Sequence, residues 1–518
     1  MKKLAVSGLA CATLLFVFAD YAFAHGGQFR GGRYRGPGDV VPPDSGGGST
    51  GTPTPTTPGA PAPAAPAAPG PTTPGPSSPG APTTPSPGAP MGGGGPTTGR
   101  GGTTVTDDLS GWQFWWEFNK DPFIRLKDAI HSREATTGSD EYFMGPTRRV
   151  SSSDSAKPSD SDILETILPA LKRALDTTDQ RDITGACMIA MAKIGKNHPK
   201  FDLLPIFTKT MVTFDQEIRE TAALAMGISQ MTDAIEPLRH LALGDADGRK
   251  LVDKAEVDTR TRSFAVYGMG LIAHKTANVA HKRTTLETMA KILRNDRQMD
   301  RNILVAAVNT IGLLNPDRQK EGDPNSVLNK ALDELDHFYA KKLGRGRELI
   351  QSHVPPAVSK LLGRGREGRR VAYKKLYRKE LTSGKKRSND VYRASAIGLG
   401  QLALPREQDA KEGIYSKALL DYFKKGKDQQ ARYSALMSLG KFCGNTMWFE
   451  MLTVLSKGKT ALERPWAALA LGVMCFHMFE ADESASAETT IGDAMLKQFR
   501  GVKTPQSRSA FAIALGLA

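Results

Sequence analysis

Cysteine is scarce in this chain: the four residues among 518 are too few for the disulfide framework that holds small secreted domains together. Long hydrophobic runs are also missing, since no apolar stretch reaches the roughly 20 residues of a membrane-spanning helix. Aromatic residues make up only 7% of the chain, whereas 52 glycines and 33 prolines are present. We therefore expect no transmembrane segment, and a folded core that is confined to part of the chain.

Motifs that carry chemistry are missing too. The sequence has no G-x-S-x-G, G-x-x-x-x-G-K-[ST], C-x-x-C or H-E-x-x-H pattern, and its nine histidines are scattered. It therefore offers no activated nucleophile, phosphate-binding loop or zinc ligand set that can be recognised by spacing. We predict that the protein is not an enzyme and that it has neither a metal site nor a cofactor.

The N-terminus has the three parts of a cleaved export signal. Lys2 and Lys3 are basic, residues 4–19 are apolar, and Ala22-Phe23-Ala24 forms an A-x-A cleavage site ahead of His25. We expect residues 1–24 to be removed and the mature chain to be exported, either to the periplasm or to the cell envelope or exterior. Export would leave an odd number of cysteines, which we expect to be mainly buried thiols (Cys187, Cys443 and Cys475).

Residues 25–106 have the composition of a tether. Nineteen of the 33 prolines lie between Pro37 and Pro96, and residues 36–102 contain no aromatic side chain. Such a segment has too little apolar surface to offset the entropy of ordering, so it samples open, polyproline-like conformations. We predict a disordered Pro/Gly/Thr-rich spacer ahead of the folded part.

From residue 162 onward, one helical phrase recurs. Small residues stand two and five positions before a glycine, an aliphatic residue directly precedes that glycine, and an arginine often stands eight positions before it, as in Arg219, Ala222, Ala225, Met226 and Gly227. The clear copies end at Gly227, Gly270, Gly440 and Gly472, and weaker copies end at Gly195, Gly312, Gly363, Gly400 and Gly516. Most intervals between these glycines are 32 to 44 residues, which is typical of a solenoid.

Each phrase follows another amphipathic segment, so the repeating unit is predicted to be a helix hairpin. Small residues would let the second helices of successive hairpins approach closely, while Leu, Ile, Met and Phe fill the layer between them. The predicted fold class is therefore all-α, an α-solenoid of stacked hairpins over residues 162–518. We expect the second helices to form its concave surface.

The phrase resembles HEAT repeats of the short bacterial kind, over roughly Asp162 to Ala518. In that family the usual role is a curved scaffold that binds protein partners, although a few relatives are bilin lyases and one is a metal-dependent hydroxylase built on His-Glu dipeptides. No His-Glu pair occurs here, which argues against the hydroxylase chemistry. The resemblance implies a scaffold. The segment from Trp112 to Phe123 also resembles one in exported bacterial HEAT-repeat proteins of unassigned function.

An aromatic cluster lies in the segment 107–161, between the tether and the array. Three of the five tryptophans are here, and helical spacing would place Trp112, Trp115 and Trp116 on one side, with Phe118 on another. We expect this segment to cap the open end of the first repeat with its rings. The alternative is a stacking site for a sugar or a partner peptide.

A basic island spans residues 341–387, where 16 Lys and Arg stand against three Glu, and we expect it to be an insertion in the array. The hexapeptide LGRGRE occurs twice in it, at residues 343–348 and 362–367, and places Arg beside Gly on predicted loops. The candidate polyanion-binding residues are Arg345, Arg347, Arg364, Arg366, Arg369, Arg370, Lys374 and Lys375. A solvated charged insertion is the simpler interpretation of the same residues.

The sequence thus predicts an exported scaffold that binds a protein partner through the solenoid surface. The alternative function is binding of an anionic polysaccharide or another polyanion through residues 341–387. Nucleic acid is not the expected polyanion, because an exported protein rarely meets it.

Overall fold

The computed structural model describes residues 111–124, 158–344, 346–384, 387–405, 408–442, 445–460, 462–481 and 489–518. The predicted signal peptide (1–24) and the predicted tether (25–106) lie outside these residues, as does Cys443. Within the described residues every regular element is a helix, and the single β-type pairing is an isolated bridge between His198 and Phe201. None of these helices is both long and apolar enough to cross a membrane.

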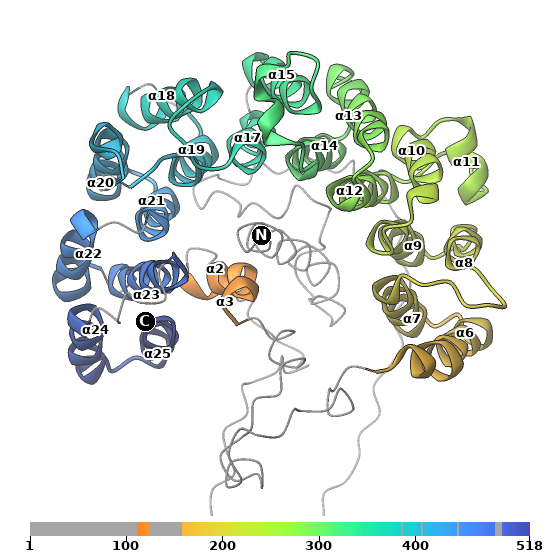
Figure 1. Ribbon diagram of the computed structural model, residues 1–518, viewed down its shortest axis with the longest axis horizontal. Coiled ribbons are helices and arrows are strands. Elements are labelled where there is room, and N and C mark those ends of the chain that lie inside the picture. Colours follow the sequence, from red (N-terminus) through yellow and green to blue (C-terminus); the bar gives the residue numbers. More distant parts are fainter. Residues whose placement is uncertain are drawn as a thin grey trace, which may run out of the picture. The chain divides into compact units, whose positions relative to one another are not determined.

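The helices from residue 168 onward form hairpins, and the two helices of each hairpin belong to two rows (Figure 1). The first helices, called the A row here, are α6 (Leu168–Thr177), α8 (Leu203–Thr210), α10 (Ile235–Leu243), α13 (Val279–Arg294), α15 (Val327–Ala340), α18 (Arg369–Thr382), α20 (Gly413–Lys425), α22 (Asn445–Lys457) and α24 (Thr489–Gly501). The second helices, called the B row, are α7 (Arg181–Ile194), α9 (Gln216–Ile228), α12 (Thr259–Lys275), α14 (Arg301–Leu313), α17 (Val354–Leu362), α19 (Asn389–Leu402), α21 (Gln429–Lys441), α23 (Glu463–Ala481) and α25 (Pro505–Leu517).

Shorter helices stand outside the two rows. They are α2 (Trp112–Asn119), α3 (Asp121–Ile124), a π-helical turn before α6 (Asp162–Ile167), α11 (Ala246–Val252), α16 (Glu348–Gln351) and three 3-10 turns (Thr232–Ala234, Arg318–Gly322 and Ala410–Glu412). Each B-row helix packs on the next one, from α7 to α25 without a break, and neighbouring A-row helices touch in several places, such as α13 with α15 and α18 with α20. The chain is an α-solenoid of stacked hairpins, as the sequence predicts.

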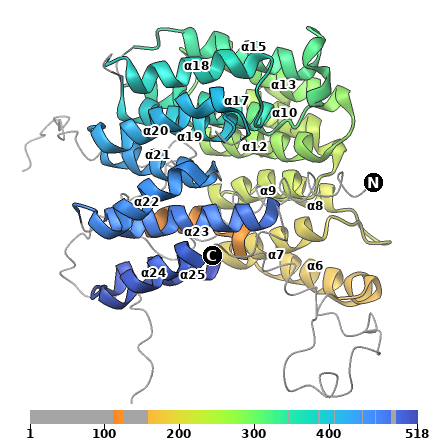
Figure 2. The same cartoon turned by 60° about the vertical axis from the view of Figure 1, so that its left-hand side comes forward.

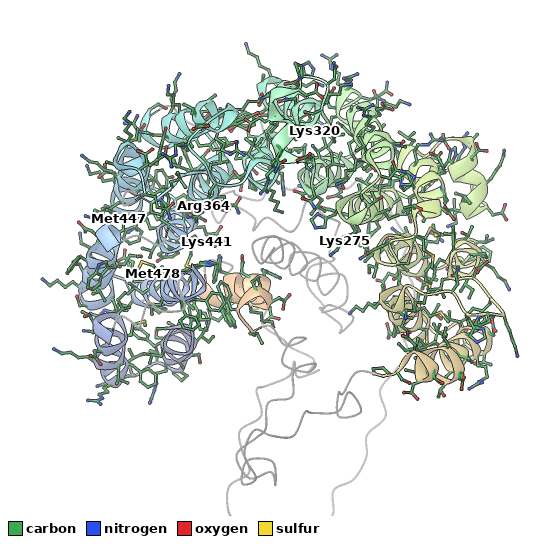
Figure 3. All side chains as sticks on the ribbon, viewed as in Figure 1. Lys275, Lys320, Arg364, Lys441, Met447 and Met478 are labelled. Carbon is green, nitrogen blue, oxygen red and sulfur yellow. The ribbon has the colours of Figure 1, made fainter. Side chains whose placement is uncertain are left out.

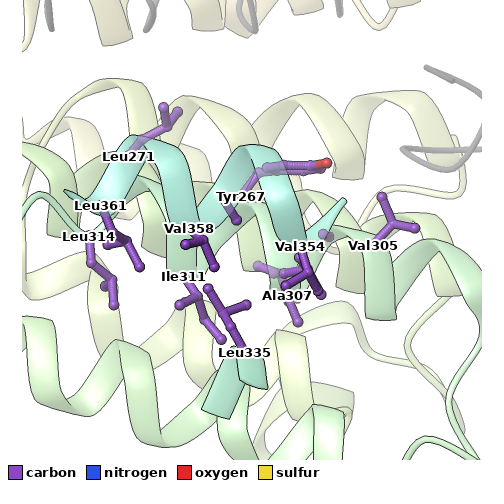
Figure 4. Packing of buried hydrophobic residues seen from close by; sticks show 14 of the residues in the cluster. Tyr267, Leu271, Val305, Ala307, Ile311, Leu314, Leu335, Val354, Val358 and Leu361 are labelled. Carbon is purple, nitrogen blue, oxygen red and sulfur yellow. The ribbon is translucent and has the colours of Figure 1, made fainter. Parts of the chain in front are cut away.

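The glycine of the repeated phrase lies where two B-row helices come closest. A Cβ built on Gly227 in α9 would lie 2.4 Å from the Cα of Gly268 in α12, and one on Gly472 in α23 would lie 2.7 Å from the carbonyl oxygen of Ala514 in α25. Aliphatic side chains fill the remaining space, as in the layer between α12, α14 and α17 (Figure 4). The small residues of the phrase therefore set the spacing of the B row.

Capping residues lie at a fixed position ahead of several B-row helices. Asp215, Asp300, Ser388 and Asp428 are N-caps whose side-chain oxygens accept backbone N–H bonds, and each stands 12 positions before its phrase glycine. Asp258 has the same position ahead of α12, but its carboxylate accepts from the Arg219 guanidinium instead. This second regularity marks where five of the B-row helices begin, namely α9, α12, α14, α19 and α21.

The arginine of the phrase joins three elements. Arg219 is 1% exposed and donates to the carbonyl oxygen of Thr213 (2.6 Å) and to Asp258. Arg432 likewise donates to the Phe423 carbonyl at the end of its own A-row helix and to Glu463 at the start of the next B-row helix. The recurring arginine thus satisfies carbonyls that a helix end leaves without partners, and ties one hairpin to the next.

The basic island is not an insertion. It contains α17 and α18, which take ordinary places in the B row and the A row: α17 packs between α14 and α19, and α18 packs on α19 and α20. The sequence suggested an insertion because many charged residues surround the helical phrase here. In the structure, Leu361 and Leu362 are buried at the end of α17 and make its packing contacts.

Candidate functional site

The aromatic segment forms α2 and α3, and its rings pack against α23. Trp115 lies edge-on to Trp466 with ring centroids 6.4 Å apart, and Phe123 lies edge-on to Phe476 at 5.0 Å. Trp112 is buried. Both views place α2 and α3 beside α23 (Figure 1, Figure 2).

This position differs from the expected cap on the first repeat. The described rings of α2 and α3 pack against rings of the eighth hairpin. The physical reason is the choice of partners: α23 offers Trp466 and Phe476 for edge-on packing, whereas α7 buries methionine and aliphatic side chains.

The rings of the aromatic segment, which could form a stacking site, already pack against one another. Trp116 stacks on Phe123 at 5.9 Å, and Trp115 also contacts Phe123 at 6.5 Å. Phe118 is half-buried. The rings therefore form one small cluster with α23 instead of an open platform.

Two arginines of the basic island form ion pairs with acids that precede the island. Arg369 bonds Asp333 and Asp336, each at 2.6 Å, and Arg370 bonds Glu321 at 2.6 Å. These carboxylates lie in α15 and in the 3-10 turn before it, 33 to 49 residues away along the chain. Both positive charges are thus compensated within the array.

Lys374 is fully buried and also serves the fold. Its amine donates to Glu412 at 2.5 Å and to the carbonyl oxygen of Gly365 at 2.8 Å. A charge with no exposure and with a bonded carboxylate cannot contact a polymer from solvent. This candidate is a structural residue that joins α18 to the turn before α20.

The other island candidates divide into bonded and exposed residues. Arg347 donates to the carbonyl oxygen of Asp296 at 3.0 Å, while Arg366 and Lys375 are exposed. Arg345 lies outside the described residues. Part of the charge counted along the sequence is therefore compensated in space, by acids from neighbouring repeats.

Arg364 belongs to a different group of cations, which the sequence did not bring together. We call Lys360, Arg364, Lys441 and His477 the cationic cluster; they come from the end of α17, the loop after it, the end of α21, and α23. Arg364 is exposed and donates through Nη2 to the carbonyl oxygens of Gly400 (3.3 Å) and Lys441. Figure 3 shows Arg364 and Lys441 beside each other on the side of the B row that faces α2.

The pKa values of these groups are lowered by burial and by one another. Burial lowers the pKa of Lys441 to about 8, with further lowering by Arg364 and Lys360, and burial lowers the pKa of Lys360 to about 8. Burial also lowers the pKa of His477 to about 4, to which Lys441 and Arg364 contribute. His353, seven residues before Lys360, has its pKa lowered to about 4 by burial and then by Lys360.

A second perturbed group lies near the start of the B row. Glu220 in α9 is 3% exposed, accepts from Gln216 at 2.8 Å, and pairs with Arg260 of α12 at 2.7 Å. Burial raises the pKa of Glu220 to about 7. Sequence spacing did not reveal the cationic cluster or Glu220, because important partners of each come from other repeats.

Comparison with known proteins adds little. No protein-family model matches the chain, and comparison with curated proteins finds no similar sequence. One similar solved structure is the crystal structure of an engineered protein from the Northeast Structural Genomics Consortium, which is 12% identical with a TM-score of 0.27. The alignment covers 68% of this chain and 98% of that chain, and a score this low carries no argument.

Proposed function

We propose that this protein is an exported scaffold that binds a protein partner through the B-row surface of a HEAT-like array. The supporting observation is the unbroken row of B helices from α7 to α25, each packed on the next. Repeat proteins use such rows as extended binding surfaces, because each unit adds a strip of surface beside the last. The role is interaction and not catalysis.

The ion pairs of the basic island favour a protein partner over a polyanion. Arg369, Arg370 and Lys374 form ion pairs with carboxylates of the array. An anionic polymer would therefore contact mainly exposed residues such as Arg366 and Lys375. Binding of an anionic polysaccharide through these two residues and their neighbours remains the alternative function. It differs in its strong dependence on salt.

The test is affinity capture from an envelope fraction with the mature chain and two variants, each at low and moderate salt. One variant changes half-buried B-row side chains (Asn309→Arg with Ile397→Arg), and the other neutralises exposed island residues (Arg366→Gln with Lys375→Gln). We expect one discrete protein to be retained by the wild type and by the island variant at both salts, and to be lost from the B-row variant.

Thermal unfolding of all three proteins checks that the variants are folded. Retention of the same protein by the B-row variant would contradict the proposed surface. Polydisperse anionic material that is lost from the island variant and at moderate salt would establish the alternative function.

A further inference from the structure

The helix α23 is longer than its place in the B row requires. It continues past its phrase glycine, Gly472, to Ala481, nine residues later, whereas α9, α14 and α21 end one residue past theirs and α12 ends five residues past. We call residues 473–481 the α23 extension. The phrase glycine lies at the contact with the next B-row helix, so stacking at that contact does not account for the extension. The extension carries two aromatic side chains, Phe476 and Phe479.

The α23 extension and α21 receive the rings of α2 and α3. Phe123 lies edge-on to Phe476 of the extension, with ring centroids 5.0 Å apart. Trp115 lies 6.4 Å from Trp466 at the start of α23, and its ring lies 5.9 Å from the Lys441 amine at the end of α21. Because Trp466 and Phe476 are ten residues apart in one helix, α2 and α3 together lie along about 15 Å of α23.

This contact leaves apolar surface exposed on both of its sides. Phe479, one turn after Phe476, is 57% exposed, and Ile124 at the end of α3 is 47% exposed. Of the six aromatic residues in α2 and α3, only Trp112 is buried, and the others are half-buried. Partly exposed rings are typical of an interface, whereas a repeat core buries its side chains fully. A segment that covers more of the same apolar surface would bind more tightly.

Chain connectivity does not force α3 onto the eighth hairpin. The 33 residues 125–157 join α3 to the first hairpin of the array, and at full extension a chain of that length spans about 110 Å. The position of α2 and α3 therefore follows from the ring contacts. Because the segment and its site belong to one chain, the segment acts at an effective concentration on the order of 0.1–1 mM, which a ligand from outside the chain has to overcome.

We propose that α21 and α23 form a binding site for an aromatic helical segment, that α2 and α3 occupy this site within the chain, and that a protein partner with a similar segment displaces them. The partner segment would present rings at positions i, i+3 and i+4, as Trp112, Trp115 and Trp116 do. A longer apolar face on that segment would also cover Phe479. This inference rests on the proposed function, since the site lies on two B-row helices and the ligand is part of the protein partner.

A synthetic peptide of residues 111–124, with a fluorophore and a short polar tail, tests the site without knowledge of the partner. Its receptor is the full chain with Trp115→Ser and Phe123→Ser, called the opened variant. We expect saturable binding of one peptide per chain to the opened variant, and binding at least 10-fold weaker to the wild type, whose own segment competes. Absence of saturable binding to the opened variant, or equal binding to both proteins, would overturn the proposal.

A further substitution and a matched control locate the site. Phe476→Ser, added to the opened variant, should weaken peptide binding by 10-fold or more, because it removes the ring that receives Phe123. Phe449→Ser removes a ring of α22 that is 63% exposed, and it should leave binding within 2-fold. Equal losses in the two variants would mean that the peptide binds any exposed ring, and this would overturn the assigned site.

A protease site placed between residues 125 and 157 tests displacement without changing any ring, and it also serves if the opened variant does not fold. After cleavage of the full chain, the N-terminal fragment that carries α2 and α3 should separate from the array on gel filtration in the presence of excess peptide. A fragment that stays with the array under these conditions would be a permanent part of the fold, and displacement by a partner would be wrong.

Capture from the envelope fraction then separates this inference from the proposed function. The opened variant should retain the protein partner at a bait concentration at least 10-fold lower than the wild type needs. Equal retention would show that the partner does not compete with α2 and α3, which would overturn the displacement. If neither protein retains a partner, the proposed function fails, and the peptide measurements alone decide whether the binding site exists.

Discussion

Replacing Gly227 with alanine tests whether close helix approach sets the spacing of the B row. The new Cβ would lie 2.4 Å from the Cα and 2.8 Å from the carbonyl oxygen of Gly268, whereas ordinary contact begins at 3.4 Å. Both obstacles are backbone, so α9 and α12 must separate by about 1 Å, which forfeits a quarter to a half of the dispersion energy across the contact.

The expected loss of stability follows from two opposing effects. Overpacking of this kind costs about 1–3 kcal/mol, and the better helix propensity of alanine returns at most about 0.5–1 kcal/mol. We therefore expect Gly227→Ala to destabilise the first hairpins by about 1–2 kcal/mol. Urea unfolding gives the midpoint, and hydrogen exchange of the amides in α9 and α12 shows whether the loss is local, as expected for a repeat array.

Gly185→Ala is the matched control. Gly185 lies in the same row, in α7, but a Cβ there would find its nearest neighbours 3.8 Å away, in the side chain of Thr221. This variant should be as stable as the wild type or more stable by up to about 1 kcal/mol. If the Gly227 and Gly185 variants have equal midpoints and equal exchange rates, the glycine of the phrase does not act through close approach.

Three further predictions concern buried polar groups. Arg219→Gln should lower the unfolding free energy by about 3–5 kcal/mol, because it leaves Asp258 without its buried partner. Arg181→Gln removes an exposed ion pair and should lower it by less than about 1 kcal/mol. Denaturant unfolding midpoints of the two variants test this difference. Because burial raises the pKa of Glu220 to about 7 from an ordinary 4.5, its protonated form favours the folded state, so the unfolding free energy should fall by up to about 3 kcal/mol from pH 4.5 to 7. In Glu220→Gln that part of the slope should disappear; an unchanged pH profile would contradict the assignment. The Cys187 thiol, which is buried and has a raised pKa, should react with a thiol reagent only as fast as the array opens, and faster modification would place it at the surface.

The repeat array could be predicted because its determinants are local. The small residues around Gly227 and Gly472 lie within one helix, and their spacing reports the face that meets the next B-row helix. The role of the arginine in the repeated phrase could not be predicted from local spacing. Arg219 has one partner six residues away and the other 39 residues away, and only the second connects hairpins.

The position of the aromatic segment was predicted wrongly. Its helical spacing was correct for α2, but its position was inferred from closeness in sequence to the first hairpin. Ring packing depends on where other rings are, and those that Trp115 and Phe123 contact lie some 350 residues later, at Trp466 and Phe476. Nothing in the local pattern reports a contact of that range.

The charge of the basic island was counted over a continuous stretch of sequence, but several of its ion pairs reach acids of other repeats. In a solenoid the neighbours of a side chain lie about one repeat away: Arg370 pairs with an acid 49 residues before it, and Lys374 with one 38 residues after it. Charge balance in such a fold has to be counted across adjacent repeats, at separations near the repeat length. One hydrogen bond reaches further still: the Arg364 guanidinium donates to the carbonyl oxygen of Lys441 at the end of α21, which is two positions beyond α17 in the B row.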